Sequence, residues 1–242
     1  IIEIRTFGGL KVSRRGVELP EQGWRTERAR ALLACFAVNY YRPLPVEVLL
    51  ESFWPDRPPR ETRRLFHTNL YYLRRALVHG AEDMDLLCYR SGSYALNLQH
   101  FWIDVKEFDE LASRRPDRET LSRAVKLAQG PCLLGLYDSW AIEAQQRYEL
   151  KVVKVLTNLA HLCARDGDLC EAIEHARAAL NMDPWNEGIV RRLVEWYCKI
   201  GERALAMRCF ETLRRNLSEE FGIPPSPETL SLVGRLLGEW PA

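Results

Sequence analysis

RPPRETRRLFHTNLYYLRRAL, residues 57–77, holds six arginines and a single glutamate in one predicted helix with its leader. Its apolar positions recur at steps of four, three and four: Phe66, Leu70, Leu73 and Leu77. This spacing is typical of the buried stripe of an amphipathic helix, so the arginines fall on the exposed face. The alternating residues LLCYRSGSYALNL at 86–98 then predict a β-hairpin that turns at Ser91-Gly92.

The net charge of +1 is divided unevenly along the chain. Residues 1–100 hold 15 Lys and Arg against 11 Asp and Glu, which gives +4, and the remaining residues hold 19 against 22, which gives −3. Arginine far outnumbers lysine in the basic part, and its planar guanidinium suits paired hydrogen bonds to phosphates and guanine edges. The composition therefore indicates a basic module joined to a mildly acidic one.

The 242 residues suit one large domain or two ordinary ones. Alternating apolar residues over 1–20 predict a small antiparallel sheet, and Thr26 is a predicted helix N-cap. The helices expected in this part are 27–39, 45–53 and 60–78. With the hairpin, these elements form a predicted first domain over residues 1–103.

From residue 104 the pattern is helical almost throughout. The expected helices are 104–114, 117–129 and 139–165, followed by four shorter ones. An offset of 34 residues relates Gly167 to Gly201 and Ala172 to Ala206, a period typical of tetratricopeptide repeats. We predict a second domain over 104–242, with stacked helix pairs and a concave surface. The expected fold is thus mainly α with a small β-sheet: a winged helix-turn-helix domain and a tetratricopeptide-like helical bundle or solenoid.

A cationic helix needs an anionic partner, and double-stranded DNA is the simplest candidate because its major groove admits one helix. Arginines supply phosphate contacts, and shorter polar groups reach bases or sugars. The candidate contacts on this helix are Arg60, Arg63, Arg64, His67, Thr68, Asn69, Tyr71, Tyr72, Arg74 and Arg75. The alternative is a solvated face paired with Glu61 and Asp56, which the lack of acidic residues between Arg63 and Val78 disfavours.

Two further segments carry candidate DNA contacts. Arg90 and Ser91 lie near the predicted hairpin tip, where an arginine can enter a minor groove. Arg25 and Thr26 precede the first helix, and the free amides of a helix N-terminus bind phosphate readily. The alternatives are an ordinary surface arginine and an ordinary helix cap.

Motifs of enzymes are absent from the sequence. There is no GxxxxGK[ST], GxGxxG, HExxH or GxSxG, and the five histidines are dispersed. We expect no enzyme, no metal site and no cofactor. The seven scattered cysteines form no CxxC pair, which indicates mostly buried, reduced thiols and a cytoplasmic protein.

No apolar run reaches the roughly 18 residues that span a bilayer, so no membrane partner is expected. The chain begins Ile1-Ile2 without methionine, which indicates a fragment of a longer protein or an additional disordered start.

Nine blocks, in this order, carry a family resemblance: IEIRTFGGLKV, WRTERARALLACF, VEVLLESFWPD, LYYLRRAL, GSYALNL, WIDVKEFDEL, the GP…G…W…R segment that ends in Arg147, DGDLCEAIEHARAALNMDPWNEG and LSEEFGIPPSPETL. The chain resembles the Streptomyces antibiotic regulatory protein family, which joins an OmpR/PhoB-type winged helix to a bacterial transcriptional activator domain. The resemblance implies a sequence-specific activator that binds promoter repeats and contacts RNA polymerase, with Arg63–Arg75 in the major groove. Tyr71 and Tyr72 depart from the basic residues common in such helices, so no base preference is transferred.

We therefore expect a DNA-binding transcription regulator that acts as a homodimer or in tandem on double-stranded DNA. Its helical domain serves dimerisation, effector response or RNA polymerase contact. One alternative is a protein-interaction scaffold whose basic helix binds an acidic partner or RNA. The other is a sensing module that holds a small-molecule effector on the concave face of residues 104–242.

Overall fold

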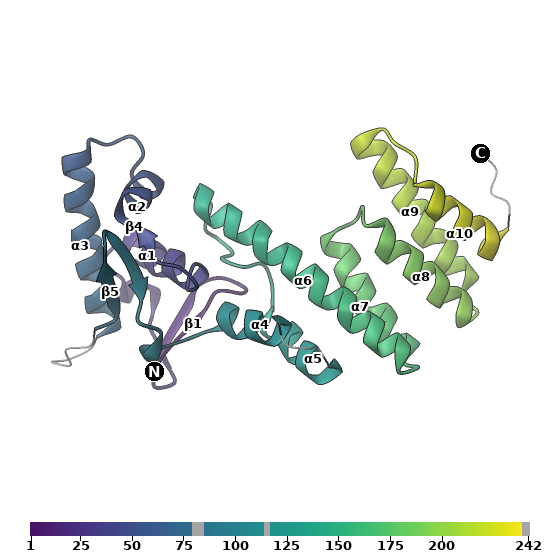
Figure 1. The fold of residues 1–242 in the computed structure, drawn as a ribbon, viewed down its shortest axis with the longest axis horizontal. Helices are drawn as coiled ribbons and strands as arrows, with labels where there is room; N and C mark the ends of the chain where they lie inside the picture. Colours follow the sequence, from purple (N-terminus) through teal and green to yellow (C-terminus); the bar gives the residue numbers. More distant parts are fainter. Residues whose placement is uncertain (79–84, 114–116, 239–242) are drawn as a thin grey trace. The chain divides into compact units, whose positions relative to one another are not determined.

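Helices dominate the protein, as the sequence predicts, and two small sheets accompany them (Figure 1). The computed structural model describes residues 1–78, 85–113 and 117–238. Contacts divide the chain into two compact units: Ile1–Arg114 with Lys126–Tyr148, and Arg115–Val125 with Glu149–Ala242.

The first sheet has the strand order β3-β2-β1-β7. Its strands are β1 (Ile2–Arg5), β2 (Lys11–Arg14), β3 (Val17–Glu18) and β7 (Phe101–Ile103). Ile4 lies opposite Val12 in an antiparallel pair and opposite Ile103 in a parallel pair. The alternation of apolar residues predicted β1 to β3. It did not predict β7, because three residues that pair with a strand far back in the chain leave no local signal.

The three helices expected in the first hundred residues are confirmed. They are α1 (Glu27–Val38), α2 (Val46–Phe53) and α3 (Pro59–Leu77). The hairpin is also present, as β5 (Leu87–Arg90) and β6 (Ser93–Leu96), and the short strand β4 (Leu44–Pro45) completes a sheet of order β4-β6-β5. Short 3-10 turns occur at Glu21–Gly23 and Leu98–His100.

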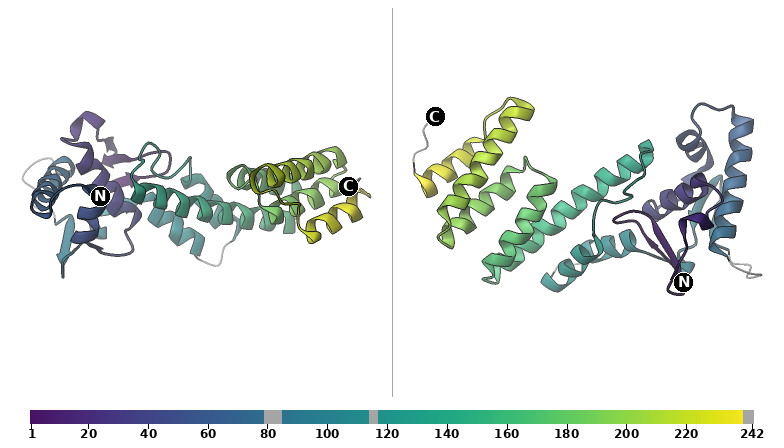
Figure 2. Two further views of the ribbon diagram at one scale, coloured as in Figure 1. Left: turned by 90° about the horizontal axis from the view of Figure 1, so that it is seen from above. Right: turned by 180° about the vertical axis from the view of Figure 1, so that it is seen from behind.

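The apolar stripe of α3 faces the interior of the first unit. Its four residues are each 2% exposed or less: Phe66, Leu70, Leu73 and Leu77. The ring of Phe66 meets the ring of Tyr94 on β6, with their centroids 5.5 Å apart. The hairpin therefore packs against α3, and Figures 1 and 2 show the two side by side.

The segment 126–148 folds back onto the first sheet. The backbone N–H of Gly8 donates to the carbonyl of Pro131 at 2.9 Å, and Phe7 forms a β-bridge with Cys132. Gly8 has a φ of +76°, and a Cβ there would lie 2.7 Å from the carbonyl oxygen of Gln129. Glycine is thus required by both conformation and close approach. The boundary between 103 and 104 stays a prediction, since the contacts group residues differently.

Buried Asp104 fastens the end of β1 to the start of α4 (Asp104–Ser113). Its carboxylate accepts hydrogen bonds from the backbone N–H groups of Thr6 and Phe7, at 2.6 and 2.9 Å. Burial raises the pKa of this carboxyl, and these hydrogen bonds oppose the rise. Residue 114, the end of the expected helix 104–114, lies outside the described residues.

Helix pairs build the second unit, as the 34-residue offset predicts. The remaining helices are α5 (Arg118–Leu127), α6 (Ser139–Arg165), α7 (Leu169–Met182), α8 (Glu187–Lys199), α9 (Arg203–Phe221) and α10 (Pro227–Leu237). Gly167 and Gly201 end equivalent turns with φ of +90° and +83°, and Ala172 and Ala206 are fully buried. Figure 2 shows α7 to α10 stacked side by side.

All seven cysteines are free thiols, but their burial is more mixed than expected. Cys35, Cys132 and Cys163 are buried, Cys170 is exposed, and the other three are half-buried. Within the described ranges, no helix combines the length and apolar character needed to cross a bilayer.

Candidate nucleic-acid interface

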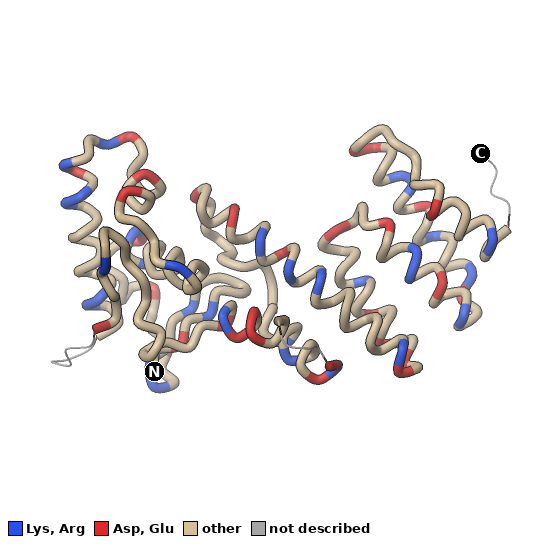
Figure 3. Tube along the Cα trace, viewed as in Figure 1, with Lys and Arg blue, Asp and Glu red and all other residues tan. Residues whose placement is uncertain are grey.

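The outer face of α3 carries arginines near both ends of the helix and polar side chains between them. Its exposed side chains are Arg60, Arg63, Arg64, His67, Thr68, Tyr71, Arg74 and Arg75. Glu61 is the acidic residue of the first turn, and no acid follows it on the helix. Figure 3 shows the basic positions recurring along α3. The helix thus presents guanidinium groups at the two ends of a face that is about five turns long.

Few of these arginines are neutralised by acids. Arg63 pairs with Glu47 of α2 at 3.4 Å, and both side chains are mostly exposed, so the pair is weak. Glu61 is paired with Arg57, which lies before the helix. Across the part of the chain that the structure describes, Arg60, Arg64 and Arg74 make no ion pair. Their charge is available to an external anion.

Asn69 does not share this exposed face. It is 6% exposed, and its amide donates to the carbonyl of Leu65 at 2.8 Å. Its Oδ1 accepts a hydrogen bond from the hydroxyl of Thr26 at 2.5 Å. The expectation that Asn69 reaches bases is therefore corrected: a residue one turn ahead of Leu73 lies at the edge of the buried stripe, and its polar atoms are used within the fold.

Thr26 is the N-cap of α1, as the sequence predicts. Its hydroxyl oxygen accepts a hydrogen bond from the backbone N–H of Ala29 at 3.1 Å while it donates to Asn69. The half-buried hydroxyl thus joins the start of α1 to the middle of α3.

Arg25 lies beside α3, although 47 residues separate it from Tyr72. Its guanidinium carbon is 5.9 Å from the centroid of the Tyr72 ring, within the range of a cation–π contact. A cavity of about 540 Å³ is lined by Arg25, Tyr72 and Arg75, together with Gln22, Gly23 and Ala76. The fold therefore brings Arg25, Tyr72 and Arg75 together around one hollow. The side chain of Tyr72 is half-buried and lines this cavity, so it is less free to contact DNA than a fully exposed side chain.

The hairpin tip carries the last two candidates. Arg90 and Ser91 are exposed, and the turn residues Ser91 and Gly92 have φ of +48° and +76°. Positive φ at both central residues matches the right-handed twist of the strands, as in a two-residue type I′ turn. The carbonyl of Gly92 accepts from the N–H of Val46 at 2.9 Å, so the tip is tied to the start of α2.

Sequence reasoning missed Tyr89 as a surface residue. Its side chain is 59% exposed, and its ring lies 4.7 Å from the ring of Tyr94 on the paired strand. An aromatic ring directly before Arg90 offers a stacking surface beside a cation. The strand alternation places Tyr89 on the same face of β5 as the buried Leu87. It does not indicate that this face is covered at Leu87 and open to solvent at Tyr89.

This arrangement of guanidinium groups can bind an extended anion through charge and hydrogen bonds, with no covalent step. Guanidinium groups along α3, at Arg25 and at Arg90 come from three separate segments of the first unit. Such groups make paired hydrogen bonds to phosphate oxygens.

Comparison with known proteins places the chain in a family. The model of the bacterial transcriptional activator domain matches residues 103–237, which is more than half of the chain. The chain belongs to the family of proteins with this domain.

Relatives in the same class are transcriptional regulators. The chain is 25% identical over 257 residues to the transcriptional regulatory protein MoaR1 of Mycobacterium tuberculosis, covering 99% of this chain and 80% of that one. It is 26% identical to the regulatory protein AfsR of Streptomyces coelicolor, covering 95% of this chain and 24% of that one.

A solved structure shares the fold. The structure of Mycobacterium tuberculosis EmbR in complex with a low-affinity phosphopeptide superposes with a TM-score of 0.75, at 24% identity. The match covers 100% of this chain and 66% of EmbR.

Proposed function

We propose that this chain is a sequence-specific DNA-binding transcription regulator in which α3 enters the major groove. The observation that carries the proposal is the exposed arginine face of α3, with Arg60, Arg64 and Arg74 free of ion pairs among the described residues. A major groove is wide enough for one helix and has phosphates on both sides. The names of MoaR1 and AfsR, both regulators, support the same function.

The first unit would act as a winged-helix domain. In this proposal α2 and α3 form the helix-turn-helix, and β5 with β6 forms the wing. The tie between Gly92 and Val46 would hold the wing at a fixed angle to α2, so that Arg90 reaches the backbone or the minor groove beside the α3 contact. Arg25, at the start of α1, would bind a flanking phosphate.

Base selection would rest on few side chains. His67, Thr68 and Tyr71 are exposed between the two pairs of arginines and are polar at their tips. The hydroxyl of Thr68 donates to the carbonyl of Arg64 at 2.9 Å, and the hydroxyl of Tyr71 accepts from Arg75 at 3.2 Å. His67 is therefore the exposed side chain with the most freedom to read a base edge.

The proposal is tested by selecting binding sites from random duplexes with the purified chain, followed by anisotropy measurements on the selected and a scrambled duplex. We expect a preference of at least a hundredfold for the selected duplex at physiological salt. His67→Ala should change the selected sequence, while Arg64→Ala should weaken binding to both duplexes. Equal affinity for the selected and scrambled duplexes would favour the scaffold alternative.

A matched control is available in the second unit. Arg215 is an exposed arginine within α9. Arg215→Ala removes the same charge as Arg64→Ala from a helix that lies outside the proposed interface. Its affinity for DNA should equal that of the wild type.

The helical repeats would act in the step that follows DNA binding, the contact with RNA polymerase. We propose that the tetratricopeptide-like pairs α6–α7 and α8–α9 contact RNA polymerase, and that two copies of the chain occupy tandem or palindromic sites. The family description as a transcriptional activator supports polymerase contact. In vitro transcription from a promoter that carries the selected duplex tests this role: activation by the full chain is expected, and DNA binding without activation would contradict it.

A further inference from the structure

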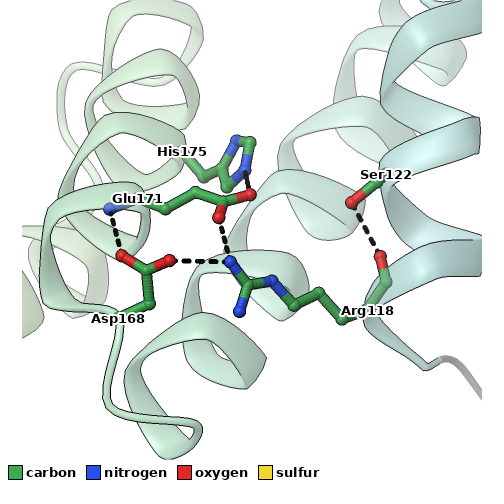
Figure 4. A network of polar contacts seen from close by, with 5 residues as sticks. All are labelled: Arg118, Ser122, Asp168, Glu171 and His175. Carbon is green, nitrogen blue, oxygen red and sulfur yellow. Dashed lines mark hydrogen bonds and ion pairs between the residues drawn. The ribbon is translucent and has the colours of Figure 1, made fainter.

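Three side chains of metal-ligating type meet between α6 and α7 in the second unit. Cys163 of α6 brings a thiol, and Glu171 and His175 of α7 bring a carboxylate and an imidazole, with their ligand atoms all within 4.8 Å of one another. Glu171 and His175 are four residues apart, so they share one face of α7. Figure 4 shows Glu171 between His175 and Arg118, with Asp168 beside them. The spacing matches no sequence motif for a metal, because the ligands are separated by the turn between two helices.

The separations are close to those of a tetrahedral site. A zinc ion with bonds of about 2.0–2.3 Å holds its ligand atoms roughly 3.3–3.8 Å apart. His175 Nε2 already lies 3.2 Å from Glu171 Oε1. The longest separation must shorten by about 1 Å, which small changes of the Glu171 and His175 side-chain torsions can supply.

The net charge of the cluster favours binding of a cation. The guanidinium of Arg118 forms ion pairs with both Asp168 and Glu171. With a neutral thiol and a neutral imidazole, the cluster of these five side chains carries a net charge of −1. A divalent ion that replaces the thiol proton brings this charge to zero.

The two oxygens of Glu171 have different partners. Oε2 accepts from Arg118, whereas Oε1 faces His175. Arg118 also bonds Oδ2 of Asp168 at 2.8 Å, and Oδ1 of Asp168 caps α7 through the N–H of Glu171. Oε1 can therefore bind a metal while Oε2 stays hydrogen-bonded to Arg118. Such outer hydrogen bonds orient ligating carboxylates in metal sites.

We propose that Cys163, Glu171 and His175 form a site for a divalent ion of the zinc class, with a fourth position open to water. The sulfur, nitrogen and oxygen donors together suit zinc and cobalt better than magnesium or calcium. On binding, the Cys163 thiol gives its proton to solvent and its sulfur bonds the metal. The ion would fasten α6 to α7, with α5 held through Arg118.

Cobalt titration of the metal-free chain under reducing conditions tests the site. Cobalt bound by a thiolate gives a near-ultraviolet charge-transfer band and visible d–d bands. We expect both to saturate at one equivalent and to disappear when zinc is added. Cys163→Ser should abolish the charge-transfer band, and His175→Gln, at a position whose side chain is 20% exposed, should weaken cobalt binding at least tenfold.

Two controls separate this site from other donors. Cys170→Ser removes the exposed thiol next to Glu171, and His161→Gln removes a histidine on α6 outside the cluster. Both variants should keep the full spectrum. Far-ultraviolet circular dichroism shows whether each variant is folded. If Cys163→Ser does not fold, the cobalt affinity of His175→Gln tests the proposal. A charge-transfer band that is absent from the folded wild type or unchanged in folded Cys163→Ser, or a cobalt affinity that is unchanged in folded His175→Gln, overturns the proposal.

Discussion

Removing Arg74 isolates one proposed phosphate contact. Its side chain is exposed on α3 and makes no ion pair among the described residues, so Arg74→Ala should leave the fold intact. Alanine also has the highest helix propensity, which keeps α3 helical. The expected effect is therefore on binding alone.

The magnitude follows from counterion release. Each neutralised phosphate contributes about −0.9 to the slope of log K against log salt, so five arginines of α3 give about −4.5 and four give about −3.6. Between 50 and 200 mM salt, these slopes correspond to affinity losses of about 500-fold and about 150-fold. Arg74→Ala should thus bind more weakly at low salt and lose less affinity as salt rises.

Fluorescence anisotropy of a labelled duplex over this salt range measures both slopes. Arg215→Ala, in α9, is the charge-matched control and should retain the wild-type slope. A wild-type slope for Arg74→Ala would remove Arg74 from the contacts. A flattening of equal size in the control would show that net charge, and not the α3 face, governs binding.

Three further changes test the structural roles of buried or capping groups. Asn69→Ala should destabilise the chain by about 1–2 kcal/mol in urea unfolding, because the Thr26 hydroxyl loses its acceptor, and should leave base preference unchanged. Asp104→Ala should cost about 2–4 kcal/mol in the same assay, because two backbone N–H groups at the end of β1 lose their acceptor inside the protein. Asp168 has a pKa held below 3.8 by the N–H of Glu171 and by Arg118, so its stabilising effect is complete above 3.8 and is lost as the pH falls through the lowered value. Thermal unfolding of Asp168→Asn should show a weaker loss of stability across that acidic range than the wild type.

Local patterns in the sequence predicted the secondary structure closely. The period of Phe66, Leu70, Leu73 and Leu77 was enough to identify the buried side of α3, and the 34-residue offset was enough to find the helix pairs. These features depend on neighbours within one or two turns, or on a repeat, so they can be read without knowing the fold.

The candidate sites needed the tertiary structure to different degrees. The exposed arginines of α3 follow from its periodicity, whereas the hydrogen bond between Asn69 and Thr26 joins residues 43 positions apart. Likewise, the sequence does not predict the cation–π contact between Arg25 and Tyr72. Side chains that meet across long separations leave no periodic signal, because their distance depends on how the elements between them pack.

The sequence by itself determined that the chain is mainly helical, that one helix is cationic and that a hairpin follows it, since hydrophobic periodicity and charge are local properties. Only the tertiary structure decided that residues 126–148 return to the first sheet and that Cys163, Glu171 and His175 converge. The physical reason is that chain reversals between elements are set by the summed packing of many buried contacts, which no single segment encodes.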